Sequence, residues 1–238
     1  MTYVTSDLHG FSIERFLKML DYVGFSDSDE LYVLGDVIDR GSDGIRLLYW
    51  MMQHSNVKLL HGNHEGMMLN CSFVLDRIDE DLMGALTRER MDRLMHWMHN
   101  GGDTTIAGLS RLSPEMRTML FEYVRNAPYY KKLTVGDRKF VLVHAGLGNF
   151  SPERRLCTYD IYDLVWHRPT PDERYYDDVT TIFGHTPTGY YGYAYKGRMV
   201  VTDTWINIDT GAAGGGCPML LRLDDMKPFY FDEIPELA

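Results

Sequence analysis

Residues 31–41 read Leu-Tyr-Val-Leu-Gly-Asp-Val-Ile-Asp-Arg-Gly, an apolar run that ends in a polar cluster. Four further polar clusters occur along the chain, and they supply aspartate, histidine or asparagine. They begin at Asp7, Gly62, Val143 and Phe183. Because the carboxyl ends of strands are where α/β proteins build their sites, this repetition predicts an α/β fold with one site at a sheet edge.

The first seventy residues alternate between strand and helix patterns. Residues 2–5 and 57–60 are predicted strands on either side of the apolar run 31–34. Apolar residues recur at helical spacing over 13–23, and Ser42 is a candidate cap for a second helix. Strand-helix-strand repetition is typical of a mixed or parallel sheet with crossover helices.

The middle of the chain differs, because residues 76–127 have almost no β-branched runs. We expect helices over 88–99 and 114–124, with Asn100-Gly101-Gly102-Asp103 as a flexible turn between them. These helices would form an insertion that covers one side of the core. The interpretation is therefore a single domain over residues 1–238 with a helical insertion at about 76–127.

Strand patterns dominate from Tyr129 onward. Gly136-Asp137 separates 132–135 from 139–143 and predicts a hairpin. Further strands are expected over 180–183, 199–202, 206–208 and 219–223. The tyrosines between them favour alternating strand packing, with an aromatic substrate wall as the alternative: Tyr190, Tyr191, Tyr193 and Tyr195. The whole pattern predicts two sheets packed together with helices outside.

Composition limits the possible functions. The chain has 238 residues, of which 45% are hydrophobic, enough for one well-buried core. A net charge of -10 argues against a broad nucleic-acid surface. The three cysteines form no C-x-x-C pair, which favours a reducing cytoplasm. No signal-peptide pattern or membrane-spanning apolar stretch is present in the sequence, so no membrane partner is expected.

The polar clusters carry hard oxygen and imidazole ligands, which suit two divalent metal ions. Candidates are Asp7, His9, Asp36 and Asn63. Two-metal hydrolases hold their ions about 3.5–4 Å apart and need an anionic bridge, and Asp36 is the candidate bridge because it stands between the other clusters. A shared water would ionise near neutral pH and attack phosphorus in line. Such ligands suit Mn, Fe, Zn, Co or Mg.

A phosphate ester also needs a cation and a proton donor. The planar fork of Arg40 can bind two phosphate oxygens, and Arg168 is a second possibility. His64 can protonate the leaving group, and Asp39 can orient that imidazole.

Residues 35–41 together with Gly62-Asn63-His64-Glu65 closely resemble the calcineurin-like metallophosphoesterases. Within that superfamily the chain resembles the serine/threonine phosphoprotein phosphatases, especially the small bacterial and phage type similar to the lambda phage phosphatase. The resemblance extends to further motifs at His96-Trp97, Val165-Trp166-His167-Arg168, Phe183-Gly184-His185-Thr186-Pro187 and Ile208-Asp209-Thr210-Gly211-Ala212.

The resemblance implies a fold and a set of roles. The fold would be a central β-sandwich with helices outside, and Mn would be the commonest activating metal. Arg40 and Arg168 would bind the phosphoryl oxygens, and His64 paired with Asp39 would act as general acid. One metal would be held by Asp7, His9 and Asp36, and the other by Asp36, Asn63, His144 and His185.

Three positions depart from the pattern of the family. Ser6 stands where a glycine is usual before the first aspartate, and His61 stands where an arginine often precedes Gly-Asn-His-Glu. Gly214-Gly215-Gly216 occupies the place of a tyrosine-bearing loop. Substrate selection should therefore differ from that of the eukaryotic enzymes.

The first hypothesis is thus a metal-dependent phosphomonoesterase acting on a phosphoprotein, a serine/threonine protein phosphatase. The second keeps the site but changes the substrate to a small phosphoester, with symmetrical diadenosine tetraphosphate hydrolysis as the leading case. The third is a non-catalytic binding module, which would lack at least one metal ligand.

Overall fold

Strand β1 (Thr2–Thr5) lies at the centre of a five-stranded sheet in the computed structural model, which describes residues 1–76 and 87–234. The strand order is β10-β9-β1-β2-β3. Three strands run parallel because helices connect them, and two return antiparallel. Their bounds are Glu30–Val33 for β2, Val57–Leu59 for β3, Met219–Arg222 for β9 and Lys227–Tyr230 for β10.

A second five-stranded sheet has the order β4-β5-β6-β8-β7. Its three central strands are parallel, and the two edge strands are antiparallel to their neighbours. Both sheets are therefore mixed, as the sequence predicted. The bounds are Tyr130–Val135 for β4, Arg138–Val143 for β5, Thr180–Phe183 for β6, Val200–Val201 for β7 and Trp205–Asn207 for β8.

The two sheets pack face to face because side chains alternate along each strand. Val4 and Tyr32 of the first sheet share one buried cluster with Leu142 of the second. Their neighbours Tyr3 and Leu31 point the other way, into a cluster formed with the helices. The inner strands β1, β2 and β9 are consequently buried on both faces over most of their length, which explains their runs of apolar residues.

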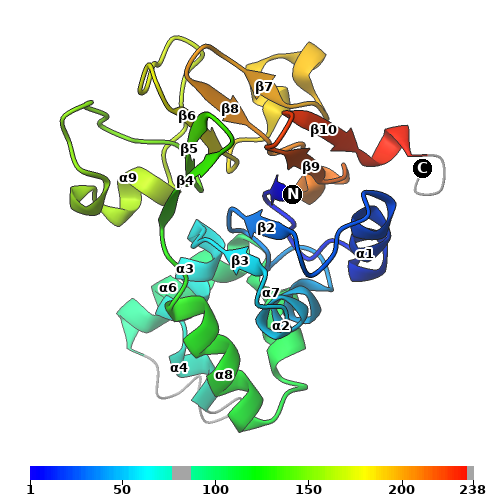
Figure 1. The fold of residues 1–238 in the computed structure, drawn as a ribbon. Helices are drawn as coiled ribbons and strands as arrows, with labels where there is room; N and C mark the ends of the chain where they lie inside the picture. The colour runs from blue at the N-terminus through cyan, green and yellow to red at the C-terminus, as the bar shows by residue number, and fades with distance from the viewer. Residues whose placement is uncertain (77–86, 235–238) are drawn as a thin grey trace.

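Helices cover the outer face of each sheet (Figure 1). Helix α9 (Ile161–Val165) packs on the second sheet through Leu164 and Val165. The others supply buried residues to the cluster on the first sheet, so the core lies in three layers. Their bounds are Ile13–Tyr22 for α1, Gly44–Gln53 for α2, Asn63–Asn70 for α3, Phe73–Asp76 for α4, Arg88–His99 for α6, Gly102–Leu109 for α7 and Pro114–Arg125 for α8.

The predicted flexible turn at Asn100–Asp103 is wrong in its second half. Helix α7 begins at Gly102, and Gly101 adopts a left-handed φ of 92° in front of it. A Cβ atom on Gly102 would lie 2.7 Å from the ring of Trp97, so only glycine permits this close approach of α7 to α6. The two glycines therefore join two helices tightly.

Two local expectations also need correction. Asp43, not Ser42, precedes α2, and its carboxylate accepts a hydrogen bond from Ile13 N of α1. The tyrosines at 190–195 do not alternate along a strand. They lie in two short 3-10 turns, η2 (Thr188–Tyr191) and η3 (Tyr193–Tyr195), because Gly192 breaks the segment with a φ of 134°.

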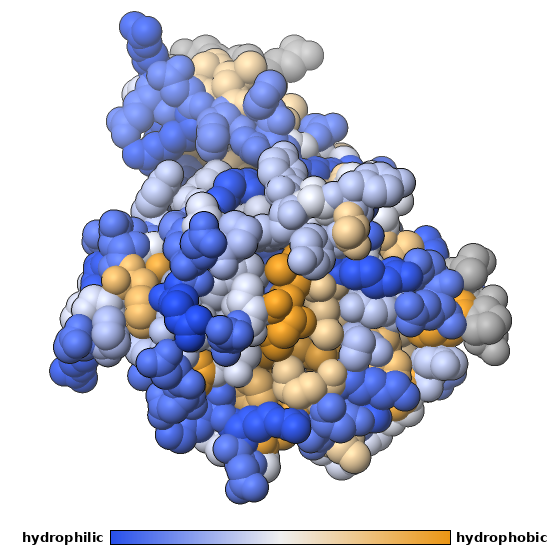
Figure 2. Space-filling view, turned by 90° about the horizontal axis from the view of Figure 1, so that it is seen from above, coloured by the Kyte–Doolittle hydropathy of each residue, from blue (hydrophilic) through white to orange (hydrophobic). Residues whose placement is uncertain are grey.

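The face of the molecule drawn in Figure 2 is dominated by hydrophilic side chains. Figure 2 shows one face of the molecule, where a narrow strip of hydrophobic residues crosses a largely hydrophilic surround. Within the described ranges, no helix has the length and apolar character needed to span a membrane.

Candidate metal centre

The loops after β1 and β2 run side by side, because these strands are parallel neighbours. His9 N donates to Asp36 O at 2.8 Å, and Gly10 N donates to Val37 O at 2.8 Å. The first two polar clusters of the sequence therefore meet at one edge of the sheet. This is the arrangement that the position of the clusters predicted.

Left-handed backbone conformations concentrate at this edge. Eight described non-glycine residues have a positive φ, and six of them are predicted site residues. Such conformations cost energy and are retained where the surrounding structure over-determines them, often at functional sites. The six are Asp7 (54°), His9 (42°), Asp36 (52°), Asp39 (70°), Arg40 (68°) and His185 (62°).

Asp36 stands between two groups of candidate ligands. One group is His9, Asp36 and His64, and the other is Asp36, His144 and His185. Within each group the ligand atoms lie within 4.8 Å of one another. Asp36 Oδ2 is 3.6 Å from His9 Nε2, and Asp36 Oδ1 is 3.4 Å from His144 Nε2. Its two oxygens thus face opposite groups, as a bridging carboxylate requires.

Asp7 and Asn63 complete the predicted ligand sets at short range. Asp7 Oδ1 lies 3.8 Å from His9 Nε2, and Asn63 Oδ1 lies 2.9 Å from His144 Nε2. The resemblance implied two ligand sets that do not include His64, which is predicted as a proton donor. In the structure, His64 lies within the first group.

Backbone carbonyls fix the orientation of two imidazoles. His9 Nδ1 lies 3.2 Å from Ile38 O, and His144 Nδ1 lies 2.7 Å from Leu34 O. A ring nitrogen facing a carbonyl carries a proton and donates it, which turns Nε2 toward the cluster as the ligand atom.

His185 supplies a direct test of whether a metal ion fits. Its Nε2 is buried and has no hydrogen-bond partner among the described residues. Burial lowers the pKa of His185 to about 2, so the ring is neutral and keeps a lone pair on one nitrogen. A buried, unpartnered lone pair beside the Asp36 carboxylate is what a divalent cation would satisfy, and the residues therefore fit a metal centre.

The carboxylates and imidazoles are strongly coupled in charge. Burial raises the pKa of Asp7 to about 6. Burial opposes ionisation of Asp36 too, but His144, His64 and His9 together outweigh it and hold the pKa of Asp36 well below its usual range. Burial would likewise lower the pKa of His144, but Asp36 raises it to about 10. Without a metal, a proton on His144 offsets the negative charge of Asp36.

Asp7 is held by contacts that leave almost no free space. Asp7 Oδ2 accepts hydrogen bonds from Ser6 Oγ at 2.5 Å and from His185 N at 2.9 Å. A Cβ atom on Gly184 would lie 2.0 Å from the same oxygen. The serine at the position where the family usually has glycine therefore adds a hydrogen bond to a candidate ligand.

The two predicted phosphate-binding arginines lie at the mouth of the cluster. The terminal nitrogens of Arg40 lie 2.9 Å from His9 Nε2 and 3.2 Å from His64 Nε2. Arg168 Nη1 donates to His185 O and to Thr186 Oγ1, both at 3.3 Å. Each arginine approaches a different group of candidate ligands, so an anion between them would meet both guanidinium groups.

His64 and Asp39 form the predicted pair. His64 Nδ1 lies 2.6 Å from Asp39 Oδ2, and both side chains are buried. Two residues to which the sequence analysis assigned no role hold Asp39: Trp97 Nε1 donates to Oδ2 at 2.9 Å, and Thr105 Oγ1 donates to Oδ1 at 2.5 Å. Both come from α6 and α7, so the helical segment positions the pair.

Glu65 is a third residue whose role the sequence left unassigned. Its fully buried carboxylate accepts hydrogen bonds from Asp36 N at 2.8 Å, Val37 N at 2.9 Å and Gly62 N at 3.0 Å. It thereby ties together the loops that carry two candidate ligands. The available signal was its place three residues after Gly62, the N3 position of a capping box at α3.

Asp209 is the fourth residue without a predicted role. It is buried and lines the same pocket, and burial together with the charge of Asp7 holds its pKa well above the usual range. Its motif was quoted from the sequence, but no spacing rule placed it near the first strand.

His61, by contrast, has a packing role. Its ring lies 4.6 Å from that of Tyr129, and its Nδ1 lies 3.0 Å from Gly62 O. The histidine at this position therefore faces the neighbouring chain segment and does not reach the pocket.

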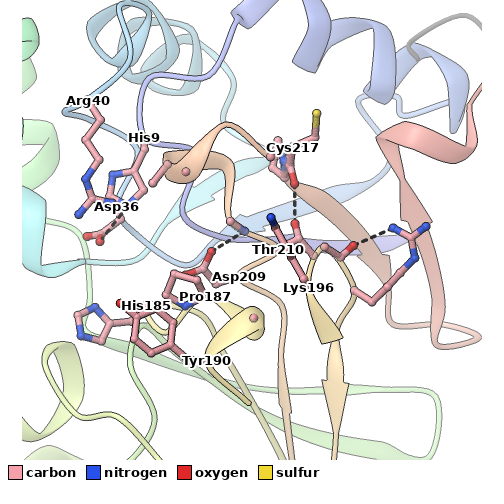
Figure 3. Close-up of a pocket in the computed structure, with 18 of the residues that line it drawn as sticks. His9, Asp36, Arg40, His185, Pro187, Tyr190, Lys196, Asp209, Thr210 and Cys217 are labelled. Atoms are coloured by element: carbon pink, nitrogen blue, oxygen red, sulfur yellow. Dashed lines mark hydrogen bonds and ion pairs between the residues drawn. The ribbon is translucent and has the colours of Figure 1, made fainter. Parts of the chain in front are cut away.

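The cluster opens into a pocket of about 1090 Å³ (Figure 3). His9, Asp36 and Arg40 lie at one end, and the pocket continues past His185 and Asp209. All ten predicted site residues thus line this pocket or lie directly against residues that do. The glycine-rich loop at 211–216 and the tyrosine turns at 188–197 form its far walls.

Comparison with known proteins agrees with this geometry. A family model described as calcineurin-like phosphoesterase matches residues 2–209. The chain is 26% identical to the symmetrical bis(5'-nucleosyl)-tetraphosphatase of Nitrosomonas europaea, over 96% of this chain and 97% of that protein. It is 27% identical to serine/threonine-protein phosphatase 1 of Salmonella typhimurium, over 93% of this chain and 91% of that protein.

Among solved structures, the chain resembles a crystal structure described as a putative diadenosine tetraphosphatase. The TM-score is 0.64 at 15% sequence identity, and the match covers 96% of this chain and 91% of that chain. At this identity the likeness concerns the fold, and it agrees with the two mixed sheets described above.

Proposed function

We propose that this chain, which belongs to the calcineurin-like phosphoesterase family, hydrolyses dinucleoside tetraphosphates. The enzyme is a hydrolase of the metallophosphoesterase kind, and the family depends on a dinuclear metal centre. The finer assignment concerns the substrate, and one observation carries it. The pocket does not end at the metal cluster, but continues along a path lined by further cations.

Arg40 and Arg168 line the pocket at the metal cluster, and Lys196 lines it further along. A single phosphoryl group needs the first two at most, whereas a chain of four phosphates carries charge well beyond the reacting phosphorus. A pocket of about 1090 Å³ is also at the upper end of the range for small-molecule sites. The name of the Nitrosomonas relative supports the same substrate class.

The predicted protein phosphatase activity becomes the second candidate. It is supported by the similarity to the Salmonella serine/threonine-protein phosphatase 1. A phosphoserine substrate, however, would leave the far part of the cationic pocket without a charged partner, since only one phosphate enters the site.

Bound divalent metal ions would polarise the phosphoryl oxygens and lower the pKa of a coordinated water. The proposed ligands are Asp7, His9, Asp36, Asn63, His144 and His185, with Asp36 shared. Mn is the proposed metal, with Fe, Zn, Co and Mg as alternatives.

The protein's own groups would bind and orient the substrate. Arg40 and Arg168 would hold the phosphoryl oxygens from two sides. His64 would carry a proton at Nε2 toward the leaving oxygen, while Asp39 accepts the hydrogen bond from Nδ1 and fixes the ring. An oxygen of water forms a bond to phosphorus, and one phosphoanhydride bond breaks.

The test is product analysis with diadenosine tetraphosphate and with a phosphoserine peptide, under each of the five metals. We expect two molecules of ADP per tetraphosphate, at a kcat/KM well above that for the peptide. If the products are ATP and AMP, the substrate class stands, but the cleaved bond lies off the centre of the tetraphosphate chain. Peptide hydrolysis with the higher kcat/KM would replace this proposal by the second candidate.

Asp36→Asn tests the shared ligand within the same experiment. It should abolish turnover of every substrate while the far-ultraviolet circular dichroism spectrum is retained. Asp21→Asn, at an exposed position on α1, is the matched control and should keep wild-type turnover.

A further inference from the structure

The turns at Thr188–Tyr195 form a rigid wall of the pocket. Thr188 N donates to Asp209 O at 2.9 Å, which fastens the segment to the loop of that buried carboxylate. Tyr191 turns inward: its hydroxyl donates to Pro169 O at 3.1 Å, and its ring lies 5.8 Å from that of Trp205. One tyrosine of the four therefore anchors the segment in the core.

Two other tyrosines point the opposite way. Tyr190 is 79% exposed and Tyr193 is 89% exposed, and both line the pocket. Core packing does not explain them, because they bury almost none of their apolar surface. Tyr195, on the same segment, is 44% exposed but does not line the pocket.

The exposed rings lie beside positive charge. Arg168 Cζ is 6.0 Å from the centroid of the Tyr190 ring, and the same guanidinium approaches the metal cluster through His185 O. The side chain of Lys196 passes over Gly189, where an added Cβ would lie 3.7 Å from Lys196 Cβ. Tyr190 thus has one cation on the cluster side and another, directly after η3, packed against the neighbouring Gly189.

The ammonium of Lys196 is not neutralised by the protein. Within residues 1–76 and 87–234, no carboxylate lies in ion-pair distance of it. By contrast, its neighbour Arg198 is paired with Asp232 at 3.0 Å. Lys196 lines the same pocket as the metal cluster, and Figure 3 shows it beyond Asp209 as seen from His9.

We infer that Tyr190 and Tyr193 form a stacking platform for the base of a nucleoside phosphate, with Lys196 and Arg168 binding its phosphates. A nucleotide places a flat aromatic base and a phosphate chain one ribose apart, which matches exposed aromatic rings set among unneutralised cations. The inference rests on the proposed function, since it assigns the nucleoside end of that substrate.

The test measures binding, by isothermal titration calorimetry on the metal-loaded enzyme. The two probes are ADP and inorganic pyrophosphate, which share phosphates but differ in the nucleoside. We expect Tyr190→Ala and Tyr193→Ala each to lower the affinity for ADP about tenfold. Stacking on an aromatic ring contributes about 1–3 kcal/mol per base, and 1.4 kcal/mol corresponds to a tenfold change in affinity. Pyrophosphate affinity should change less than about twofold.

Two matched variants control for structure. Tyr190→Trp keeps an aromatic face and should retain ADP affinity. Tyr195→Ala removes a tyrosine of the same segment outside the pocket and should change neither affinity. Lys196→Gln should lower the affinity for ADP and for pyrophosphate alike. Unchanged affinities in this variant would show that Lys196 is not part of the subsite.

Three results would overturn the platform. The first is that the wild-type enzyme binds ADP no more tightly than pyrophosphate. The second is that both alanine variants keep the wild-type affinity for ADP. The third is that these variants lose affinity for ADP and for pyrophosphate equally. Because ADP is bound and not cleaved, these outcomes are separate from the product analysis. Absence of tetraphosphate hydrolysis would refute the proposed function alone.

Discussion

Asp39 Oδ2 lies 2.6 Å from His64 Nδ1, and the indole of Trp97 and the hydroxyl of Thr105 hold the same carboxylate from the other side. Burial would lower the pKa of His64, but the charge of Asp36 and the contact with Asp39 raise it. The fold therefore favours the protonated form of this imidazole at the mouth of the candidate metal cluster. The pairing that the sequence predicted is embedded in the helical segment.

Asp39→Asn should lower kcat about 10- to 100-fold, by analogy with other groups that orient a working imidazole. The amide keeps the shape but removes the charge that raises the pKa of His64, so the alkaline limb of the kcat–pH profile should move to lower pH. Steady-state kinetics between pH 5 and 9 measure both effects. An unchanged profile would show that His64 acts without Asp39, and Asp21→Asn serves as control.

Glu65→Gln should destabilise the fold by about 3 kcal/mol, because the carboxylate accepts three backbone N–H groups and the amide would turn a donor toward one of them. For a chain of this length, that corresponds to a drop in Tm of about 10 °C. Differential scanning calorimetry of the metal-free protein measures it. Glu122→Gln, exposed on α8, should leave Tm within about 1 °C.

Gly184→Ala should weaken metal binding at least about tenfold without exposing the core. The new methyl group would occupy the position of Asp7 Oδ2 and Ser6 Oγ, so the candidate ligand must move. Metal content after dialysis against a weak chelator reports the loss. Gly136→Ala, at a hairpin turn with open space around it but a left-handed φ of 57°, tests whether backbone strain alone produces the effect.

Metal binding at pH 7.5 should release at least one proton per protein. The pKa of His144 is raised to about 10 in the metal-free protein, so its ring is charged at this pH and must lose a proton to become a ligand. Apparent metal affinity should accordingly rise with pH up to that pKa. Titration calorimetry in buffers of different ionisation enthalpy counts the protons. Release of none would mean that His144 is already neutral.

Much of the site was predictable because strand ends are encoded locally. The apolar runs before Asp7 and Asp36 predicted two parallel strands, and the geometry of parallel strands then brings their loops together. The α/β fold with two sheets was predictable for the same reason. Hydrophobic alternation predicts which faces pack, whatever the lengths of the loops.

The contacts that support the site were not predictable in this way. Trp97 and Thr105 reach Asp39 from about sixty residues further along the chain. The His96-Trp97 motif belongs to the resemblance, but nothing in the local pattern shows which residue the indole contacts. The prediction of alternating strand packing at the tyrosines was wrong for another reason. Alternation at Tyr190–Tyr195 has the period of a strand, but Gly192 permits a backbone that no periodic element adopts.

The substrate was the least predictable feature. The motif residues determine which reaction is possible, whereas the residues of the pocket walls determine which substrate binds. The chain is similar both to relatives named as tetraphosphatases and to one named as a protein phosphatase, so this family likeness does not by itself select the substrate. The walls at 188–197 and 211–216 lie outside the motifs that supply candidate ligands. Their role emerges only once the chain is folded.

The left-handed residues at the rim of the cluster have a consequence for protein engineering. Each costs on the order of 1 kcal/mol that glycine would not. A deliberately inactivated scaffold with glycine at Arg40 should therefore tolerate heat better than the working enzyme does. Directed evolution toward thermostability would then erode catalysis unless selection for turnover is applied at every round.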